Sequence, residues 1–182
     1  AVVNVVIPKR MVFVFDRSGS MAGEKMEQAR EALRFAIVSM DDGDEFNIVD
    51  YGTTVESFAE STVPIAEIST AAALSYIDGI DATGGTNIHG ALLEAAQMLQ
   101  GDEFVEMIVF LTDGKPTIGE ADLETILNDV TAANAARARL FVFGVGEEVN
   151  THLLDRLAGD NGGGSTYVKP NENIEVAVSS FY

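Results

Sequence analysis

The chain has 182 residues, of which 47% are hydrophobic and 22% are charged, so it is long enough for one compact domain with a buried core. Its net charge of -18 argues against nucleic acid or an anionic membrane surface as a partner, because both attract clustered Lys and Arg. The absence of cysteine excludes disulfides and Cys-based zinc sites, and no apolar run approaches the roughly 18 residues that a membrane helix needs.

The first predicted element is a strand at residues 11–15. This continuous apolar run ends at Asp16 and is typical of a buried parallel strand. Residues 24–40 have helical spacing, with apolar side chains on one face and Glu–Arg pairs on the other. Residues 46–51 predict a second strand, and residues 55–58 predict a third that pairs with it as a hairpin.

Two helices are predicted next, at residues 69–80 and 88–99. The loop between them includes residues 83–86, which contain two consecutive glycines. Residues 107–112 then repeat the form of the first strand, and this run also ends at a carboxylate, Asp113.

The rest of the chain continues the alternation of helix and strand. The predicted elements are a helix at 121–137, a strand at 140–145, a short helix capped by Asn150, an edge strand at 166–168 and a final helix at 172–180.

This alternation predicts a doubly wound α/β fold with helices on both faces of the sheet. We expect a mostly parallel central sheet of about six strands with one antiparallel edge strand. Residues 1–9 are interpreted as a lead-in from a preceding region, and residues 10–182 as a single domain. The chain begins with Ala1 and shows no signal peptide, so we expect it to be a part excised from a larger multidomain chain.

Two of the predicted strands end directly in a carboxylate, at Asp16 and Asp113. In open parallel sheets, ligands bind beyond the carboxyl ends of the strands, where the strand order reverses. If the two strands are neighbours there, the two carboxylates converge. The hydroxyls of Ser18 and Ser20 then line the same loop, and Thr86 supplies a third.

These oxygen ligands suit a hard divalent cation. Mg²⁺ usually takes few carboxylates and keeps several waters, so two carboxylates with three hydroxyls fit Mg²⁺, with Mn²⁺ or Ca²⁺ as alternatives. Such a site leaves one position open for an acidic group from a partner molecule. The acidic surplus of the chain fits the attraction of cations, but it equally fits a surface adapted to a salty medium.

The same residues carry a resemblance to a known family. Asp16-Arg17-Ser18-Gly19-Ser20, Thr86 within Gly84-Gly85-Thr86-Asn87-Ile88, and Asp113 within Leu111-Thr112-Asp113-Gly114 resemble the metal-ion-dependent adhesion site of von Willebrand factor A domains. Further stretches are similar to the inter-alpha-trypsin inhibitor heavy-chain branch and its bacterial relatives. They are residues 43–49, 112–120, 143–146 and 180–182.

The resemblance implies roles for these residues. Ser18, Ser20 and Thr86 would contact the metal directly, and Asp16 and Asp113 would do so directly or through water. It also implies a VIT domain before this one, more chain after it, and a location outside the cell, at the cell surface or in the periplasm. In related adhesion domains the C-terminal helix moves when ligand binds, and the helix at 172–180 would be its counterpart.

Other interpretations of single motifs stay open at this stage. Asp16, Ser18 and Ser20 alone would also suit a turn that caps a helix. Arg17 is interpreted as a surface residue facing solvent or an acidic partner, and His89 as a packed or surface helix residue. The acidic run at residues 41–45 lacks the later ligands of an EF-hand and is interpreted as a solvated loop.

The function that these features favour is a non-enzymatic adhesion or interaction module that recruits a protein or another acidic ligand through its metal. The alternative is a Mg²⁺-dependent phosphoryl-transfer or hydrolase enzyme with Asp16 as nucleophile. A third interpretation is a scaffold that binds metal only for stability.

Overall fold

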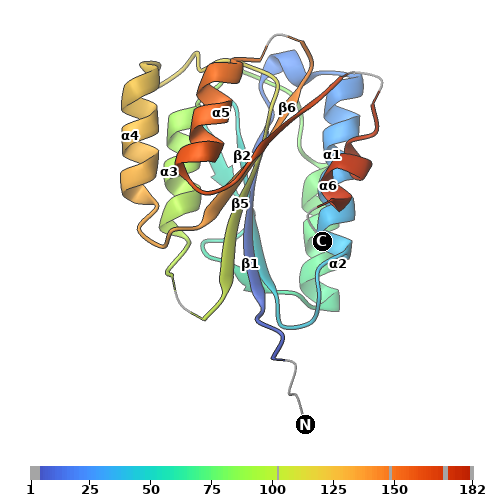
Figure 1. Ribbon diagram of the computed structural model, residues 1–182. Helices are drawn as coiled ribbons and strands as arrows, with labels where there is room; N and C mark the ends of the chain where they lie inside the picture. Colours follow the sequence, from blue (N-terminus) through green and yellow to red (C-terminus); the bar gives the residue numbers. More distant parts are fainter. Residues whose placement is uncertain (1–4, 102, 148, 170–171, 181–182) are drawn as a thin grey trace.

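The computed structural model describes residues 5–101, 103–147, 149–169 and 172–180, which form one central sheet with helices packed on both faces (Figure 1). The strands are β1 (Lys9–Asp16), β2 (Glu45–Tyr51), β3 (Val55–Ser57), β4 (Val63–Pro64), β5 (Val105–Thr112), β6 (Arg139–Val145) and β7 (Ser165–Val168). The helices are the 3-10 turn η1 (Gly19–Met21), α1 (Glu24–Val38), α2 (Glu67–Asp78), α3 (Ile88–Gln97), α4 (Leu123–Ala133), α5 (Thr151–Asp160) and α6 (Ile174–Ser179).

The sheet has the strand order β3-β2-β1-β5-β6-β7, and β4 pairs with β2 beside β3. The long strands and β7 run parallel, whereas β3 and β4 are both antiparallel to β2. The predicted doubly wound, mostly parallel sheet is confirmed. The described residues contain seven strands rather than about six, because β4 has only two residues and is too short to produce a periodic pattern.

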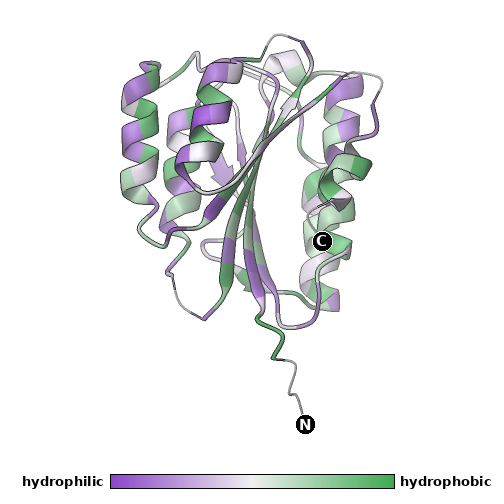
Figure 2. Cartoon of the chain, viewed as in Figure 1, coloured by the Kyte–Doolittle hydropathy of each residue, from purple (hydrophilic) through white to green (hydrophobic). Residues whose placement is uncertain are grey.

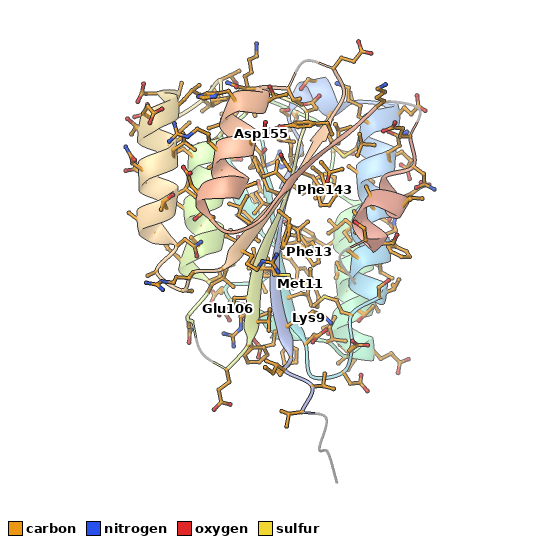
Figure 3. The ribbon with its side chains drawn as sticks, in the orientation of Figure 1. Lys9, Met11, Phe13, Glu106, Phe143 and Asp155 are labelled. Atoms are coloured by element: carbon orange, nitrogen blue, oxygen red, sulfur yellow. The ribbon has the colours of Figure 1, made fainter. Side chains whose placement is uncertain are left out.

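Alternate side chains of the central strands enter two separate cores, one on each face of the sheet. Met11, Phe13 and Phe15 of β1 pack toward α1, α2 and α6, and Figure 3 shows Met11 and Phe13 with Phe143 on that side. Val12 and Val14 pack toward α3, α4 and α5. Figure 2 shows the apolar sides of the helices turned toward the sheet and the hydrophilic sides turned outward. Because β1 is buried on both faces, its sequence is a continuous apolar run.

Most predicted helices agree with the structure, but α4 ends earlier than expected. The prediction continued to residue 137, whereas α4 ends at Ala133. The side chain of Asn134 ends it by exchanging hydrogen bonds with the backbone of Ala138, at 2.7 and 2.9 Å. Arg137 then takes a positive φ of 55°, which no α-helix contains.

The predicted cap of α5 is confirmed. Asn150 accepts a hydrogen bond from the amide of Leu153 at 3.1 Å, as an N-cap residue does. At the other end of the chain, β1 begins at Lys9, one residue inside the segment interpreted as a lead-in. None of the described helices has the length and apolar character needed to span a membrane.

The switch point of the sheet lies between β1 and β5. These two strands pair directly, with β2 on the far side of β1 and β6 on the far side of β5. Their carboxyl ends lie at the end of the sheet opposite the labelled N-terminus in Figure 1. The loops that follow β1 and β5 therefore meet at the place where a doubly wound sheet binds ligands.

Candidate metal centre

The two strands that lead into the carboxylates are neighbours, which is the condition on which their predicted convergence depends. Phe15 is in register with Leu111, so Asp16, the last residue of β1, and Asp113, directly after β5, lie at the ends of adjacent strands. Both residues are buried, with 0% and 5% of their surface exposed. Two ionised carboxylates buried near each other repel, and a cation placed close to them offsets that repulsion.

The loop after β1 is organised around Asp16. One carboxylate oxygen of Asp16 accepts the backbone N–H of Ser18 at 2.8 Å, and the other accepts the hydroxyl of Thr112 at 2.8 Å. Together these bonds fix the carboxylate at the base of the loop. The chain then turns through η1, and the hydroxyl oxygens of Ser18 and Ser20 lie 3.1 Å apart.

Asp113 connects the second loop to the first. Its Oδ1 accepts the hydroxyl of Ser20 at 2.8 Å, although the two residues are 93 positions apart in the chain. Its Oδ2 accepts the ammonium group of Lys25 at 2.6 Å, and this ammonium also donates to the backbone oxygen of Ser20 at 3.2 Å. Both oxygens of Asp113 therefore have donors in the described structure.

Thr86 belongs to a third loop that is hydrogen-bonded to the first. The amide of Gly19 donates to the backbone oxygen of Gly84 at 3.0 Å, and the amide of Thr83 donates to that of Arg17 at 2.7 Å. The backbone of Thr86 is held in turn by Thr117, whose hydroxyl accepts the Thr86 amide at 2.9 Å. Thr86 is buried.

The three loops enclose one recess of about 660 Å³. Ser20, Thr86 and Asp113 line it, together with Lys25, Gly114, Lys115, Thr117, Glu147 and Val149. Asp16 and Ser18 are both buried and are joined to this lining by the hydrogen bonds of the first loop. The five residues singled out in the sequence thus come together at one end of the sheet.

Asp16 carries the least compensated charge of the centre. Burial raises the pKa of its carboxyl above the ordinary value of 3.8, hydrogen bonds from Ser18 and Thr112 oppose that rise, and the nearby charge of Asp113 adds to it. Among the described residues, Asp16 has no ion pair with Lys, Arg or His. An ionised carboxylate in such a place favours a cation close to it.

The residues fit a hard divalent cation. Their donor atoms are carboxylate and hydroxyl oxygens, and the described chain contains no group of three or more His, Cys, Asp or Glu side chains suited to a metal. A site with two carboxylates, hydroxyls and waters matches the preferences of Mg²⁺.

The position of Arg17 differs from the one expected from the sequence. It was expected at the surface, but only 8% of it is exposed. Its guanidinium pairs with Asp50 at 2.7 Å and with Glu56 at 3.1 Å, so it braces the first loop against β2 and β3 instead of facing a partner. Because Arg17 lies between two candidate ligands in the sequence, we expected its side chain to be exposed. Only the tertiary fold brings the carboxylates of Asp50 and Glu56 into contact with it.

The acidic run at residues 41–45 was expected to be a solvated loop, but one of its residues is buried. Asp41 and Asp42 are exposed, but Asp44 is only 2% exposed. The Asp44 carboxylate accepts the backbone amides of Lys9 at 2.8 Å and of Asp41 at 2.9 Å. It therefore ties the start of β1 to this loop.

His89 lies on α3, and its ring Nε2 lies 2.9 Å from Asp129 on α4. It is therefore a helix residue away from the centre, as expected from the sequence.

Three residues of the centre were missed in the sequence. Thr112 ends an apolar strand with a hydroxyl, and that position was a visible signal. Lys25 gave no signal, because nothing in the sequence places the start of α1 next to Asp113. Tyr51 looked like an ordinary strand residue. Its hydroxyl is buried close to Asp16 and Thr112, and burial, followed by the charge of Asp16, raises its pKa well above the ordinary value of 10.0.

Known proteins similar to this chain carry related names. A family model described as "von Willebrand factor type A domain" matches residues 9–167. The chain is 37% identical to human inter-alpha-trypsin inhibitor heavy chain H4 and 34% identical to mouse heavy chain H2, in each case over 97% of this chain. The chain spans about a fifth of the length of these curated relatives, 20% in both cases.

Solved structures share the fold at lower identity. A von Willebrand factor type A protein from Catenulispora acidiphila has a TM-score of 0.85 at 23% identity, over 96% of this chain and 42% of that one. Proximal thread matrix protein 1 from the mussel byssus, in a structure described as having a zinc-occupied MIDAS motif, has a TM-score of 0.75 at 14% identity, over 96% and 47%. At these identities the likeness is one of fold.

Proposed function

The chain belongs to the von Willebrand factor type A domain family, and we propose that it is a non-enzymatic binding module built around a divalent cation. The proposed ligands are the five oxygen-bearing residues of the three converging loops: Asp16, Ser18, Ser20, Thr86 and Asp113. One further position belongs to an acidic group of a partner, such as a protein side chain.

The observation that carries this proposal is the convergence of oxygens from separate loops. The Ser20 hydroxyl lies 3.1 Å from that of Ser18 and 2.8 Å from Oδ1 of Asp113. Thr86 lines the same recess. An oxygen-only set with two carboxylates suits Mg²⁺, with Mn²⁺ or Ca²⁺ as further candidates. The zinc named for the mussel protein supports a divalent cation in this fold.

The burial of Asp16 supports a binding module over an enzyme. In the alternative, a metal-dependent phosphoryl-transfer or hydrolase enzyme, the Asp16 carboxylate would attack a substrate. A nucleophile must reach the reacting atom of its substrate. Asp16 is 0% exposed, and each of its two oxygens accepts a hydrogen bond, one from Ser18 and one from Thr112.

The wider setting of the module follows from its relatives. Because they are about five times longer, we propose that this chain works as one domain of a larger protein. The resemblance to inter-alpha-trypsin inhibitor heavy chains also favours a place outside the cell or at its surface.

Calorimetric titration tests the metal site. Mg²⁺, Mn²⁺ and Ca²⁺ are titrated into the unmutated domain, Ser18→Ala and Asp113→Ala, after treatment with chelator. We expect saturable binding by the unmutated domain and a loss of about 10-fold or more in each variant, because each removes a ligand oxygen. Ser61→Ala and Asp42→Ala, both at exposed positions, serve as matched controls.

Two results would contradict the proposal. If the unmutated domain shows no saturable binding, the proposed metal site does not exist. If all variants bind the cation with equal affinity, the cation binds at another place in the domain. A separate assay with generic phosphate esters and Mg²⁺ tests the alternative enzymatic function. Turnover by the unmutated domain that Asp16→Asn abolishes would favour a phosphoryl-transfer or hydrolase enzyme.

A further inference from the structure

Lys25 is a basic residue in direct contact with a carboxylate of the centre. It is the second residue of α1, and its ammonium lies 2.6 Å from Oδ2 of Asp113. The side chain of Asp113 is only 1% exposed, whereas that of Lys25 is 34% exposed. A lysine that can reach water is therefore held against a buried carboxylate.

The contact is defined by more than one bond. The same ammonium donates to the backbone oxygen of Ser20 at 3.2 Å, so it lies between the first loop and the second. Gly146, after β6, lies along the lysine chain, since a Cβ at that glycine would stand 3.8 Å from both Cε and Nζ. Lys25 thus has a defined place on three segments of the recess.

The charges at this end of the sheet explain why that place matters. Asp16 and Asp113 are close enough for the charge of Asp113 to raise the pKa of Asp16. Lys25 offsets the charge of Asp113 alone, and Asp16 keeps only neutral donors from Ser18 and Thr112. An ammonium paired with Asp113 lowers the attraction that this carboxylate exerts on another cation.

We propose that Lys25 is a resident counterion of Asp113 that competes with the divalent cation and thereby sets how tightly the centre binds it. The inference rests on the proposed function, because it concerns the affinity of the same site. In the metal-free domain, Lys25 spares the fold an unpaired buried carboxylate. When a divalent cation binds, the Lys25 ammonium already contacts its proposed ligand Asp113, and the repulsion between the two positive charges weakens binding of the cation.

The test compares two lysines of one recess. Lys25→Met keeps a long, mainly aliphatic side chain and removes the charge. Lys115→Met removes the same charge from an exposed lysine that lines the same recess. Mn²⁺ and Mg²⁺ are titrated calorimetrically into both variants, into Lys25→Arg and into the unmutated domain.

We expect Lys25→Met to bind the cation about 10-fold more tightly, since a charge in direct contact is removed. Lys115→Met should change the affinity by less than about 3-fold, because separated charges at an exposed position are screened. Lys25→Arg, which keeps the charge, should bind as the unmutated domain does.

Unchanged or weaker binding by Lys25→Met would overturn the inference while leaving the metal site standing. An equal gain in Lys115→Met would overturn it too, because the effect would then be one of net charge. If the unmutated domain itself binds no cation, the proposed function fails, and the inference with it.

A second measurement covers the case in which Lys25→Met folds poorly. Urea unfolding of Lys25→Gln is followed with chelator and with saturating Mn²⁺. A counterion role predicts lower stability than the unmutated domain in chelator and a larger gain on adding Mn²⁺. Equal gains in the two proteins would contradict it.

Discussion

At the scale of single residues, the centre combines groups that are costly to bury. Asp16 is ionisable and almost inaccessible to water, and its carboxylate accepts hydrogen bonds from two neutral donors, the Ser18 amide and the Thr112 hydroxyl. Tyr51 brings a fully buried hydroxyl to the same region, where the charge of Asp16 acts on it. Such groups lower the stability of the metal-free fold, and strained or undersatisfied groups of this kind tend to mark functional sites.

We predict that Asp16→Asn stabilises the metal-free domain at pH 7. Burial raises the pKa of Asp16 in the folded chain above the ordinary value of 3.8. Between the unfolded and folded pKa values the folded state binds more protons, so Asp16 reduces stability as pH rises through that window. The gain in the free energy of unfolding should exceed the roughly 0.5 kcal/mol of a neutral surface substitution.

The measurement is urea unfolding in chelator at pH 7 and at pH 3. Below pH 3.8 both states of the unmutated chain are protonated at Asp16, so the gain should vanish there. Asp42→Asn at an exposed position controls for the loss of net charge. Destabilisation by Asp16→Asn at pH 7 would show that the hydrogen bonds of this carboxylate outweigh its burial.

At the scale of elements, close backbone approaches decide where the outer strand lies. The turn between α5 and β7 contains three glycines in a row, residues 162–164. In the structure, a Cβ at Gly163 would stand 1.8 Å from the backbone oxygen of Leu140 on β6. A Cβ at Gly164 would have no atom within 4 Å. Neighbouring glycines therefore have different roles.

We predict that Gly163→Ala destabilises the domain by about 1–3 kcal/mol or more, because β6 or the turn must shift to admit the methyl group. Gly164→Ala is the matched control and should be neutral or slightly stabilising, since alanine restricts the unfolded chain. Thermal and urea unfolding of the two variants measure the difference. Equal stabilities would mean that the turn relaxes freely and that the close approach has no structural role.

At the scale of the whole molecule, the charge balance is strongly negative. The chain has 29 acidic and 11 basic residues, a net charge of -18. Several basic side chains are engaged in ion pairs at the two ends of the sheet, such as Arg17 with Asp50 and Arg10 with Glu106. The uncompensated carboxylates repel one another across the surface, and that repulsion opposes the compact state.

We predict that monovalent salt stabilises the metal-free domain. Raising NaCl from about 0.01 M to about 1 M shortens the Debye length from roughly 30 Å to roughly 3 Å, which screens the net repulsion more than the buried pairs. A gain of about 1 kcal/mol would raise the Tm by roughly 2–4 °C. Calorimetric melting in chelator, repeated with KCl, measures it. A lower Tm at high salt would mean that local ion pairs dominate.

The sequence alone determined the fold class and the five candidate ligands. The continuous apolar runs of β1 and β5 are typical of strands buried on both faces, and each run is followed by a carboxylate, so the topology rule for open sheets predicted that Asp16 and Asp113 converge if the two strands are neighbours. The resemblance of the segments around Ser18, Ser20 and Thr86 to the metal-ion-dependent adhesion site of von Willebrand factor A domains supplied the rest. These signals are local, or follow from general rules of connection.

Only the tertiary structure decided what surrounds those ligands. Asp50 and Glu56 turn Arg17 inward, and α1 begins where Lys25 can reach Asp113. Asn134 ends α4 by bonding Ala138, and Leu140 leaves no room for a side chain at Gly163. Each outcome depends on the distance between side chains or backbone atoms on different elements. Hydrophobic periodicity carries no such information, because it records which face of an element is buried and not which charge lies opposite.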